Sequence, residues 1–216
     1  MAGVTASANV SVGKPNLKVS GGILRAPLGS ERPTDPDSAL DAAYESAGYV
    51  GEDGVSEASE RSTEDIRAWG GIKVRTVQTE YGTTLTFTFI ESRRALVLKA
   101  VFGEENVTID PKGFIKVRRN ETPLESAQWV VDMKDGDRGA RRLDVGNGQI
   151  TEVGDISYVD GEAISYEVTM SCDPDENGDT LIEYVTDPDF GGGNDGNDGN
   201  DGNDGNDGND GGDTGE

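Results

Sequence analysis

Between residues 72 and 185 the chain consists of short runs in which apolar and polar side chains alternate, with turn-forming residues between the runs. An alternation with a period of two is typical of β-strands that have one buried face. About nine short strands with few helices predict an antiparallel β-sandwich or barrel, which is a mainly β (α+β) fold. The predicted strands are residues 72–78, 83–90, 106–110, 113–119, 127–133, 149–153, 156–160, 162–170 and 180–185.

Two of the connections between these runs predict tight hairpins. The stretch "TEYG" at 79–82 joins the first two runs, and Asp160-Gly161 interrupts "ISYVDGEAISYEVTM". Asp-Gly between two alternating runs is a strong hairpin signal. The segment around Asp160 is therefore the clearest hairpin that the sequence predicts.

Helices are predicted at two places. The segment "SRRALVLKAVFG" alternates adequately as a strand, but it also fits a helix over about 92–102 that Ser92 caps and Gly103 ends. The pattern by itself leaves both alternatives open. A second, short helix is predicted in "SALDAAYESAG", between Ser38 and Gly48.

The first part of the chain is predicted to contain little core. Residues 1–20 should form an N-terminal arm or a first extended strand, and residues 44–70 are polar and rich in Gly and Ser, which predicts a long loop. A loop of this length is uncommon in a compact domain unless it has a function. Tyr49 and Trp69 lie near its ends. Either both aromatic side chains fold back onto the domain, or the loop reaches a neighbouring subunit.

The formal net charge of −23 is unevenly distributed, because all 19 Lys and Arg residues lie between Lys14 and Arg142. The acidic excess is concentrated in the last third of the chain, which includes a run of Gly-Asn-Asp repeats that starts at Gly193. Such a segment cannot bury enough apolar surface to offset its conformational entropy. We therefore expect residues 187–216 to form a disordered acidic tail. Strong binding to nucleic acid is not expected, since it needs clustered Lys and Arg.

The residues that usually carry chemistry are scarce. The chain has no histidine, which removes the commonest general base and metal ligand, and its single cysteine, Cys172, excludes an internal disulfide. Asp173, Asp175 and Asn177 match the first ligand positions of a calcium loop, but Tyr184 stands where the bidentate Glu should be. We expect no catalytic site, no cofactor and no metal site, and treat these three residues as an incomplete calcium loop.

Targeting signals are also missing from the sequence. The first residues lack a charged segment followed by an apolar stretch, and the apolar run at residues 95–102 is interrupted by Lys99. A membrane span needs about 20 apolar residues. We therefore expect a soluble protein that is made in a cytoplasm and does not associate with a membrane.

Several stretches, taken in order, resemble the major tail tube protein of long non-contractile-tailed bacteriophages, the siphophage tail tube family. The likeness covers roughly residues 10–186, and the order of its short motifs carries it. These stretches are "GKPNLKVSGGILRAPLGSERPTDPDSALDAAYESAGYVGEDGV", "IRAWGG", "TFTFIESRRALVLKAVFG" and "GQITEVGDISYVDGEAISYEVTMSCDPD".

The resemblance implies a β-sandwich or barrel domain at 21–186 with one flanking helix, which favours the helical alternative for 92–102. It also implies a virion structural protein, assembled in the host cytoplasm, whose hexameric rings stack into a tube. Phage DNA would pass non-specifically through the lumen, and a tape measure protein and a tail terminator are the implied partners. The long loop would contact the adjacent subunit or ring. The candidate contact residues are Tyr44, Tyr49, Val50 and Trp69.

Three other functions compete with this interpretation. A tail-completion or head–tail connector protein would form one ring for each particle. A secreted or surface-displayed acidic adhesion module that binds calcium would need an export signal. A hydrolase could use a pair of carboxylates, but no pair is singled out among the 42 acidic residues.

Overall fold

The computed structural model describes residues 7–17, 21–136 and 139–187, and the described part up to Thr186 forms one compact unit. Its regular elements are mostly strands, with one α-helix and two short 3₁₀ turns at Ser7–Asn9 and Glu104–Asn106. The tail that the sequence predicts to be disordered lies, apart from Asp187, outside the described residues.

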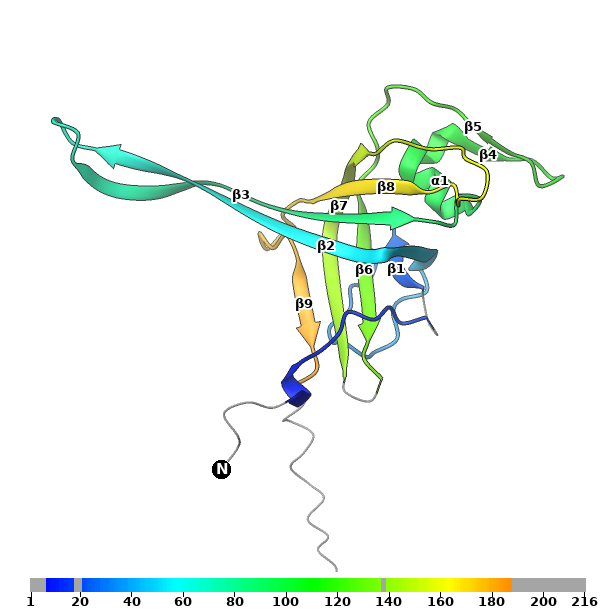
Figure 1. Ribbon diagram of the computed structural model, residues 1–216, viewed down its shortest axis with the longest axis horizontal. Coiled ribbons are helices and arrows are strands. Elements are labelled where there is room, and N and C mark those ends of the chain that lie inside the picture. Colours follow the sequence, from blue (N-terminus) through cyan, green and yellow to red (C-terminus); the bar gives the residue numbers. More distant parts are fainter. Residues whose placement is uncertain (1–6, 18–20, 137–138, 188–216) are drawn as a thin grey trace, which may run out of the picture. The chain divides into compact units, whose positions relative to one another are not determined.

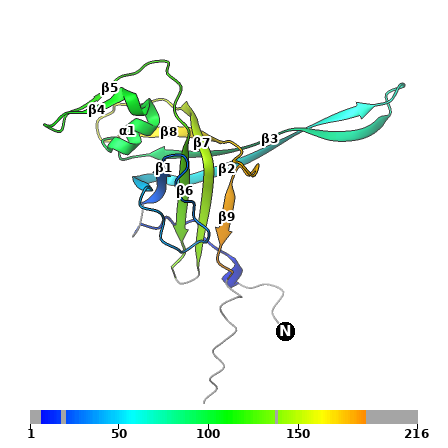
Figure 2. The same ribbon diagram turned by 180° about the vertical axis from the view of Figure 1, so that it is seen from behind.

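Six strands form a closed antiparallel barrel, as Figures 1 and 2 show. The strand order is β6-β1-β2-β3-β8-β7, and β7 pairs back onto β6, which closes the sheet. The short strand β9 (Ile182–Val185) pairs with the first half of β7. The mainly β barrel predicted from the alternation is therefore confirmed. The barrel strands are β1 (Gly22–Ala26), β2 (Glu45–Arg67), β3 (Lys73–Phe89), β6 (Ala127–Lys134), β7 (Ala140–Val153) and β8 (Tyr166–Cys172).

Aromatic side chains fill the centre of the barrel. Phe87 and Phe89 on β3 meet edge to face with ring centroids 5.0 Å apart, and Trp129 on β6 lies 6.4 Å from each of them. These three side chains are almost completely buried together with aliphatic residues of β7 and β8. Buried positions alternate strictly with more exposed ones in the barrel part of β3, residues 83–89, and in β8, as the sequence pattern predicts.

A single α-helix closes the barrel on one side. Helix α1 (Ala95–Phe102) buries Val97, Leu98 and Val101 in the same core, which confirms the helical alternative for this segment. The helix starts after Arg94 rather than at Ser92, and it ends at Gly103, whose φ of 96° suits glycine. A small second sheet, β4 (Val107–Ile109) with β5 (Ile115–Val117), follows it. Among the described residues no helix is long and apolar enough to cross a membrane.

The prediction of a loop over residues 44–70 is wrong, because most of this segment forms strand β2. Beyond the barrel, β2 and β3 continue as a two-stranded ribbon that projects from the body (Figure 1). Both faces of this ribbon meet solvent, and its β2 part lacks the alternation that marks a half-buried strand. We call this ribbon, residues 56–82, the arm.

The hairpin predicted at "TEYG" is also absent, since residues 79–82 lie inside the continuous strand β3. The chain reverses instead at the end of the arm, where the Ala68 amide donates to the Ile72 carbonyl. Gly70 and Gly71 lie between them with φ values of 95° and 86°, a conformation that favours glycine. The two alternating runs on either side of "TEYG" therefore belong to one strand.

Two further predictions of local structure are wrong. No helix forms between Ser38 and Gly48: the amides of Asp37 and Ser38 bond to the Asp35 side chain, and β2 begins at Glu45. The hairpin predicted around Asp160 has only its second arm, because residues 154–165 form no strand and β8 pairs with β3 and β7 instead.

Gly48 is a position where the fold requires glycine. Its φ is 82°, and a Cβ there would lie 2.2 Å from the Glu91 carboxylate. That carboxylate accepts the Tyr49 amide at 2.9 Å and pairs with Arg94 at 2.6 Å, so it cannot easily move aside.

We expect Gly48→Ala to lower the free energy of unfolding by about 1–3 kcal/mol, because it adds backbone strain and displaces this carboxylate. The measurement is urea denaturation of the purified protein. Gly82→Ala is the matched control, since nothing lies within 4 Å of a Cβ at Gly82. Equal stability of the two variants would contradict this account.

Candidate assembly surfaces

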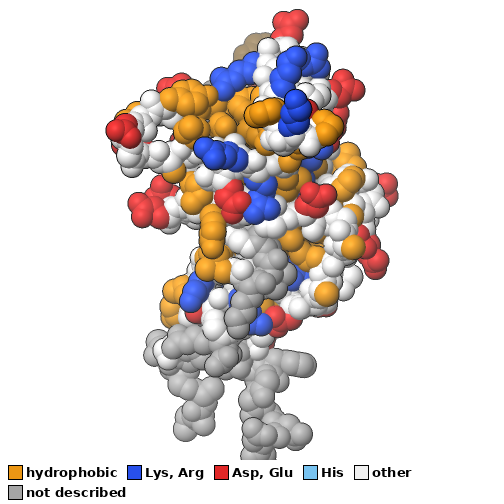
Figure 3. Space-filling model, turned by 90° about the vertical axis from the view of Figure 1, so that its right-hand side faces the viewer, with side chains coloured by type: hydrophobic (Ala, Val, Ile, Leu, Met, Phe, Trp, Pro, Cys, Tyr) orange, Lys and Arg blue, Asp and Glu red, His pale blue; other side chains and the backbone are white. Residues whose placement is uncertain are grey.

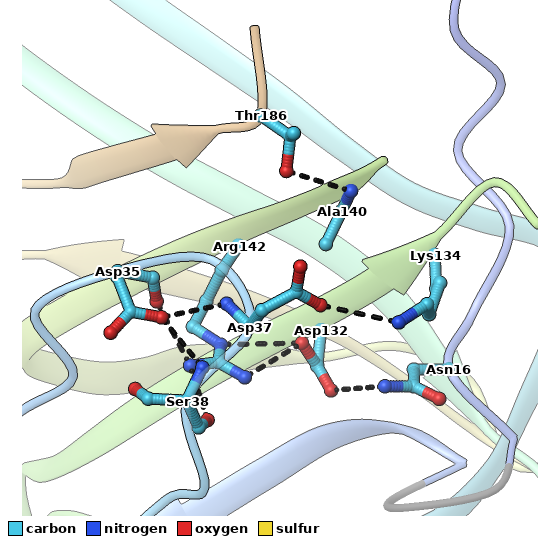
Figure 4. A network of polar contacts seen from close by, with 9 residues as sticks. All are labelled: Asn16, Asp35, Asp37, Ser38, Asp132, Lys134, Ala140, Arg142 and Thr186. Atoms are coloured by element: carbon cyan, nitrogen blue, oxygen red, sulfur yellow. Dashed lines mark hydrogen bonds and ion pairs between the residues drawn. The ribbon is translucent and has the colours of Figure 1, made fainter. Parts of the chain in front are cut away.

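A buried network of charged and polar groups fastens the N-terminal segment and the segment between β1 and β2 to one side of the barrel (Figure 4). Asp132 on β6 accepts Arg142 Nε and Nη2 at 3.2 Å through one oxygen, and Asn16 Nδ2 at 2.9 Å through the other. Arg142 Nη1 also donates to the carbonyls of Asp35 and Ser38 at 3.0 Å. One ion pair thus holds both the N-terminal segment and the irregular segment between β1 and β2.

A second, partly buried group of ion pairs holds the same irregular segment nearer its start. Arg32 donates to Asp144 at 2.9 Å and also pairs with Asp175. Burial raises the pKa of Asp144, and the Arg32 guanidinium opposes that shift. The hydrogen bond from Arg32 lowers the pKa of Asp175.

These contacts give the incomplete calcium loop a structural role. Asp175 accepts Arg32 with one oxygen and the amides of Asn177 and Asp179 with the other, while Asp173 accepts the Ser171 hydroxyl. Within the described ranges no three His, Cys, Asp or Glu side chains are grouped so that they could hold a metal ion. The absence of a metal site in the whole chain stays a prediction.

The outward face of β2, β3, β8 and the end of β7 is polar. Inward pairs such as Leu85–Met170 are buried, so the pairs between them, such as Thr86–Thr169, point outward. On the barrel this face carries hydroxyl, amide and carboxylate groups, and no Lys or Arg. Its residues are Ser56, Ala58, Thr84, Thr86, Thr88, Gln149, Glu152, Glu167, Thr169 and Ser171.

The arm continues this face and has two unlike sides. On the side that continues the barrel interior, the polar side chains contact one another. The Arg61 guanidinium lies 4.5 Å from the centroid of the Tyr81 ring, and the Thr76 hydroxyl donates a hydrogen bond to Asp65 at 2.9 Å. The register places Glu60, Glu64 and Glu80 on the other side. None of these three carboxylates has a partner among the described residues, and Arg75 is the first cation on that side.

The end of the arm is apolar and exposed. Trp69 is fully exposed, and Ile66, Ile72 and Val74 are each more than half exposed. The sequence interpretation noticed Trp69 but missed the three aliphatic residues, which become neighbours only through the turn between β2 and β3. A local signal existed in "IRAWGGIKV", where four large apolar residues surround a Gly-Gly pair.

The four residues predicted to contact a neighbouring subunit divide into two pairs. Tyr49 and Trp69 are exposed and free to meet a partner, and their role in contacts stays a prediction. Tyr44 is buried against Leu24 and Val130, because the segment before β2 folds back over the barrel, and its role in contacts also stays a prediction. Val50 is half-buried against the chain's own core, which leaves it little surface for a partner.

The antiparallel barrel with one flanking helix agrees with the architecture that the resemblance to tail tube proteins implies. The chain belongs to the phage tail tube protein family, whose sequence model matches residues 18–190. Membership in this family implies a structural component of the virion. A search of curated protein sequences gives no match.

Three solved structures are similar to the chain at low identity. The tube-terminating cap of the anti-feeding prophage is 10% identical over 86% of this chain and 100% of that one, with a TM-score of 0.42. The sheath–tube complex of an extracellular contractile injection system called PVC is 11% identical over 84% of this chain and 99% of that one, with a TM-score of 0.44. The sheath/tube terminator of the same system is 12% identical over 84% of this chain and 99% of that one, with a TM-score of 0.42.

Proposed function

We propose that the protein is the major tail tube subunit of a long non-contractile phage tail, and that it forms stacked hexameric rings around a lumen through which DNA is delivered. The observation that carries the proposal is the arm. A single two-stranded ribbon is at best marginally stable in water. The segment from Ser56 to Arg67 projects roughly 40 Å at about 3.4 Å per residue.

Both edges of the arm lack a strand partner among the described residues. β2 pairs with β1 only over Glu45–Tyr49, and β3 pairs with β8 only over Thr83–Phe89. Unpaired strand edges are templates for pairing with another chain. Identical copies that add to these edges would complete the hydrogen bonds and cover the apolar end of the arm, so self-association is the expected state of this protein.

The lumen wall in this proposal is the outward face of β2, β3, β8 and the end of β7. Lys and Arg bind DNA phosphates and would retain a passing duplex, whereas hydroxyl groups and carboxylates do not. A face without cations on the barrel is therefore suited to DNA that must slide through. A tape measure protein and a tail terminator are the further partners that we propose.

Two lysines on this face should bind DNA to the tube. We expect Thr86→Lys with Thr169→Lys to leave tube assembly intact, to increase the retention of short duplex DNA by purified tubes at least ten-fold at low salt, and to lower phage infectivity. The control carries the same added charge off this face, at Thr108→Lys with Thr122→Lys. Equal DNA retention by both variants would mean that this face does not line the lumen.

The acidic tail is proposed to lie on the outer surface of the tube. A flexible coil of about 26 residues spans ~25–30 Å, comparable with a DNA duplex, and six such coils inside the bore would obstruct passage. Charge repulsion between tails would keep long tubes apart.

Deletion of residues 190–216 should leave assembly intact and increase the bundling of tubes at moderate salt. Light scattering and negative-stain images of matched full-length and shortened protein measure this. A shortened protein that no longer assembles would show that the tail has a different role.

The tail-completion or connector alternative makes a different prediction. Such a protein stops at a single ring, whereas a major tube subunit polymerises. Negative-stain microscopy and sedimentation of the purified protein separate the two: tubes of variable length support the proposal, single rings support the connector, and a monomer at all concentrations contradicts both.

A further inference from the structure

We propose that the end of the arm of one copy inserts into a groove beside α1 on a second copy of this chain. This inference rests on the self-assembly proposed above, and it names the acceptor site. The two parts are the arm tip, defined as residues 66–75, and the α1 groove, whose main lining residues are Arg25, Leu28, Glu45, Leu96, Lys99 and Glu125.

The arm tip combines apolar surface with positive charge. It contains the four exposed large apolar side chains described above, three basic residues and no acidic one. Asp65, just outside the tip, pairs with Arg67 at 3.4 Å and with Lys73 at 2.8 Å, and Arg75 has no partner among the described residues. A surface of this kind fits an apolar groove with acidic groups at its rim.

The α1 groove has these properties. Its volume is about 420 Å³, and Leu28 and Leu96 contribute apolar walls. Glu104 in the groove is already paired with Arg25 and Lys99. The two remaining carboxylates, those of Glu45 and Glu125, have no partner among the described residues and are available to the cations of a tip.

The size of the groove suits the tip as well. An indole side chain buries about 150–250 Å² on docking and usually seeks a hydrogen-bond partner for its N–H. The groove has room for the Trp69 indole together with part of a neighbouring aliphatic side chain. Its carboxylates offer acceptors for that N–H.

The contact must join two different copies. The arm and α1 lie at opposite ends of the molecule in Figures 1 and 2, so a tip cannot reach the groove of its own chain. Figure 3 views the end opposite the arm, and hydrophobic side chains are mixed there with charged ones of both signs. A contact between two unlike surfaces repeats from copy to copy, and generates rings or filaments rather than a closed dimer.

Cysteine cross-linking tests the pairing. One variant carries Ile72→Cys in the tip, and a second carries Leu28→Cys in the groove; both positions are exposed, so neither change should unfold the protein. The two variants are mixed, allowed to assemble, and oxidised. We expect a covalent dimer at least ten-fold above the level given by either variant alone. The native Cys172 should not interfere, since burial raises its pKa to about 12.

In the matched control, the second variant carries Val159→Cys instead of Leu28→Cys. The two parent residues are similarly exposed, at 53% and 55%, but Val159 does not line the groove. Equal dimer yields at both positions, no dimer at either, or a dominant link between two tips would overturn the groove assignment. Microscopy of the same samples keeps the two proposals apart: tubes without the specific link overturn only the groove, and a persistent monomer also overturns the proposed function.

Discussion

Asp132→Ala is expected to lower the free energy of unfolding by about 3–5 kcal/mol, which is the usual cost of leaving one member of a buried ion pair without its partner. Asp132 and Arg142 are almost completely buried, with side chains 1% and 3% exposed. The variant also loses the hydrogen bond that the Asn16 side chain donates to Asp132. In a domain of this size the loss should lower the midpoint of thermal unfolding by roughly 6–20 °C, as calorimetry would record.

A nearby exposed pair provides the control. Lys134 and Asp37 lie 3.2 Å apart with side chains that are about half exposed. We expect Asp37→Ala to cost no more than about 1 kcal/mol. Replacing both buried partners, with Asp132→Leu and Arg142→Met, should cost less than Asp132→Ala alone, because no uncompensated charge remains. A loss as small for Asp132→Ala as for Asp37→Ala would contradict the assigned role of the buried pair.

The second large effect is expected on assembly rather than on stability. Trp69→Ser with Ile72→Ser should abolish tube formation, since it removes the most exposed apolar surface of the arm. Both side chains are fully or largely exposed, so the thermal midpoint should change by no more than a few degrees. Sedimentation velocity and negative-stain microscopy measure the loss of tubes.

The control for this double variant removes comparable apolar surface elsewhere. Tyr158→Ser with Val159→Ser changes two exposed residues of the segment before β8. Tubes should still form from this protein. If both double variants assemble normally, the arm tip makes no essential contact; if both fail, apolar surface in general rather than the arm drives association.

The parts of the fold that the sequence predicts are those with one buried face. The runs around Phe87 and Val168 alternate because each of these strand segments has the core on one side and a more exposed face on the other. Helix α1 was predicted as one of two alternatives, and the resemblance to tail tube proteins favoured it. In these regions local pattern and tertiary packing agree.

The β2 half of the arm could not be predicted in this way. It meets solvent on both sides, and Gly48, Gly51 and Gly54 interrupt β2 near the base of the arm, so this stretch has the composition of a loop. Pairing between β2 and β3 across the whole arm decides the structure of residues 56–67, and that pairing leaves no apolar alternation in this mostly polar part of β2.

The buried polar network could not be predicted from the sequence for a different reason. Asp132 ends the run "AQWVVD" and matches an outward position of a half-buried strand. Its partners are Arg142, ten residues away, and Asn16, 116 residues away. Only the fold of the segment between β1 and β2, which covers this side of the barrel, turns that outward position into a buried one.

The most direct test of the central claim is a cryo-electron microscopy reconstruction of tubes assembled from the purified protein. The account predicts a hollow tube whose inner wall is the face that carries Thr84, Thr86 and Thr169, with each arm pairing along a neighbouring copy. A tube with this face on its outside, or a protein that never assembles beside its tail partners, would contradict it.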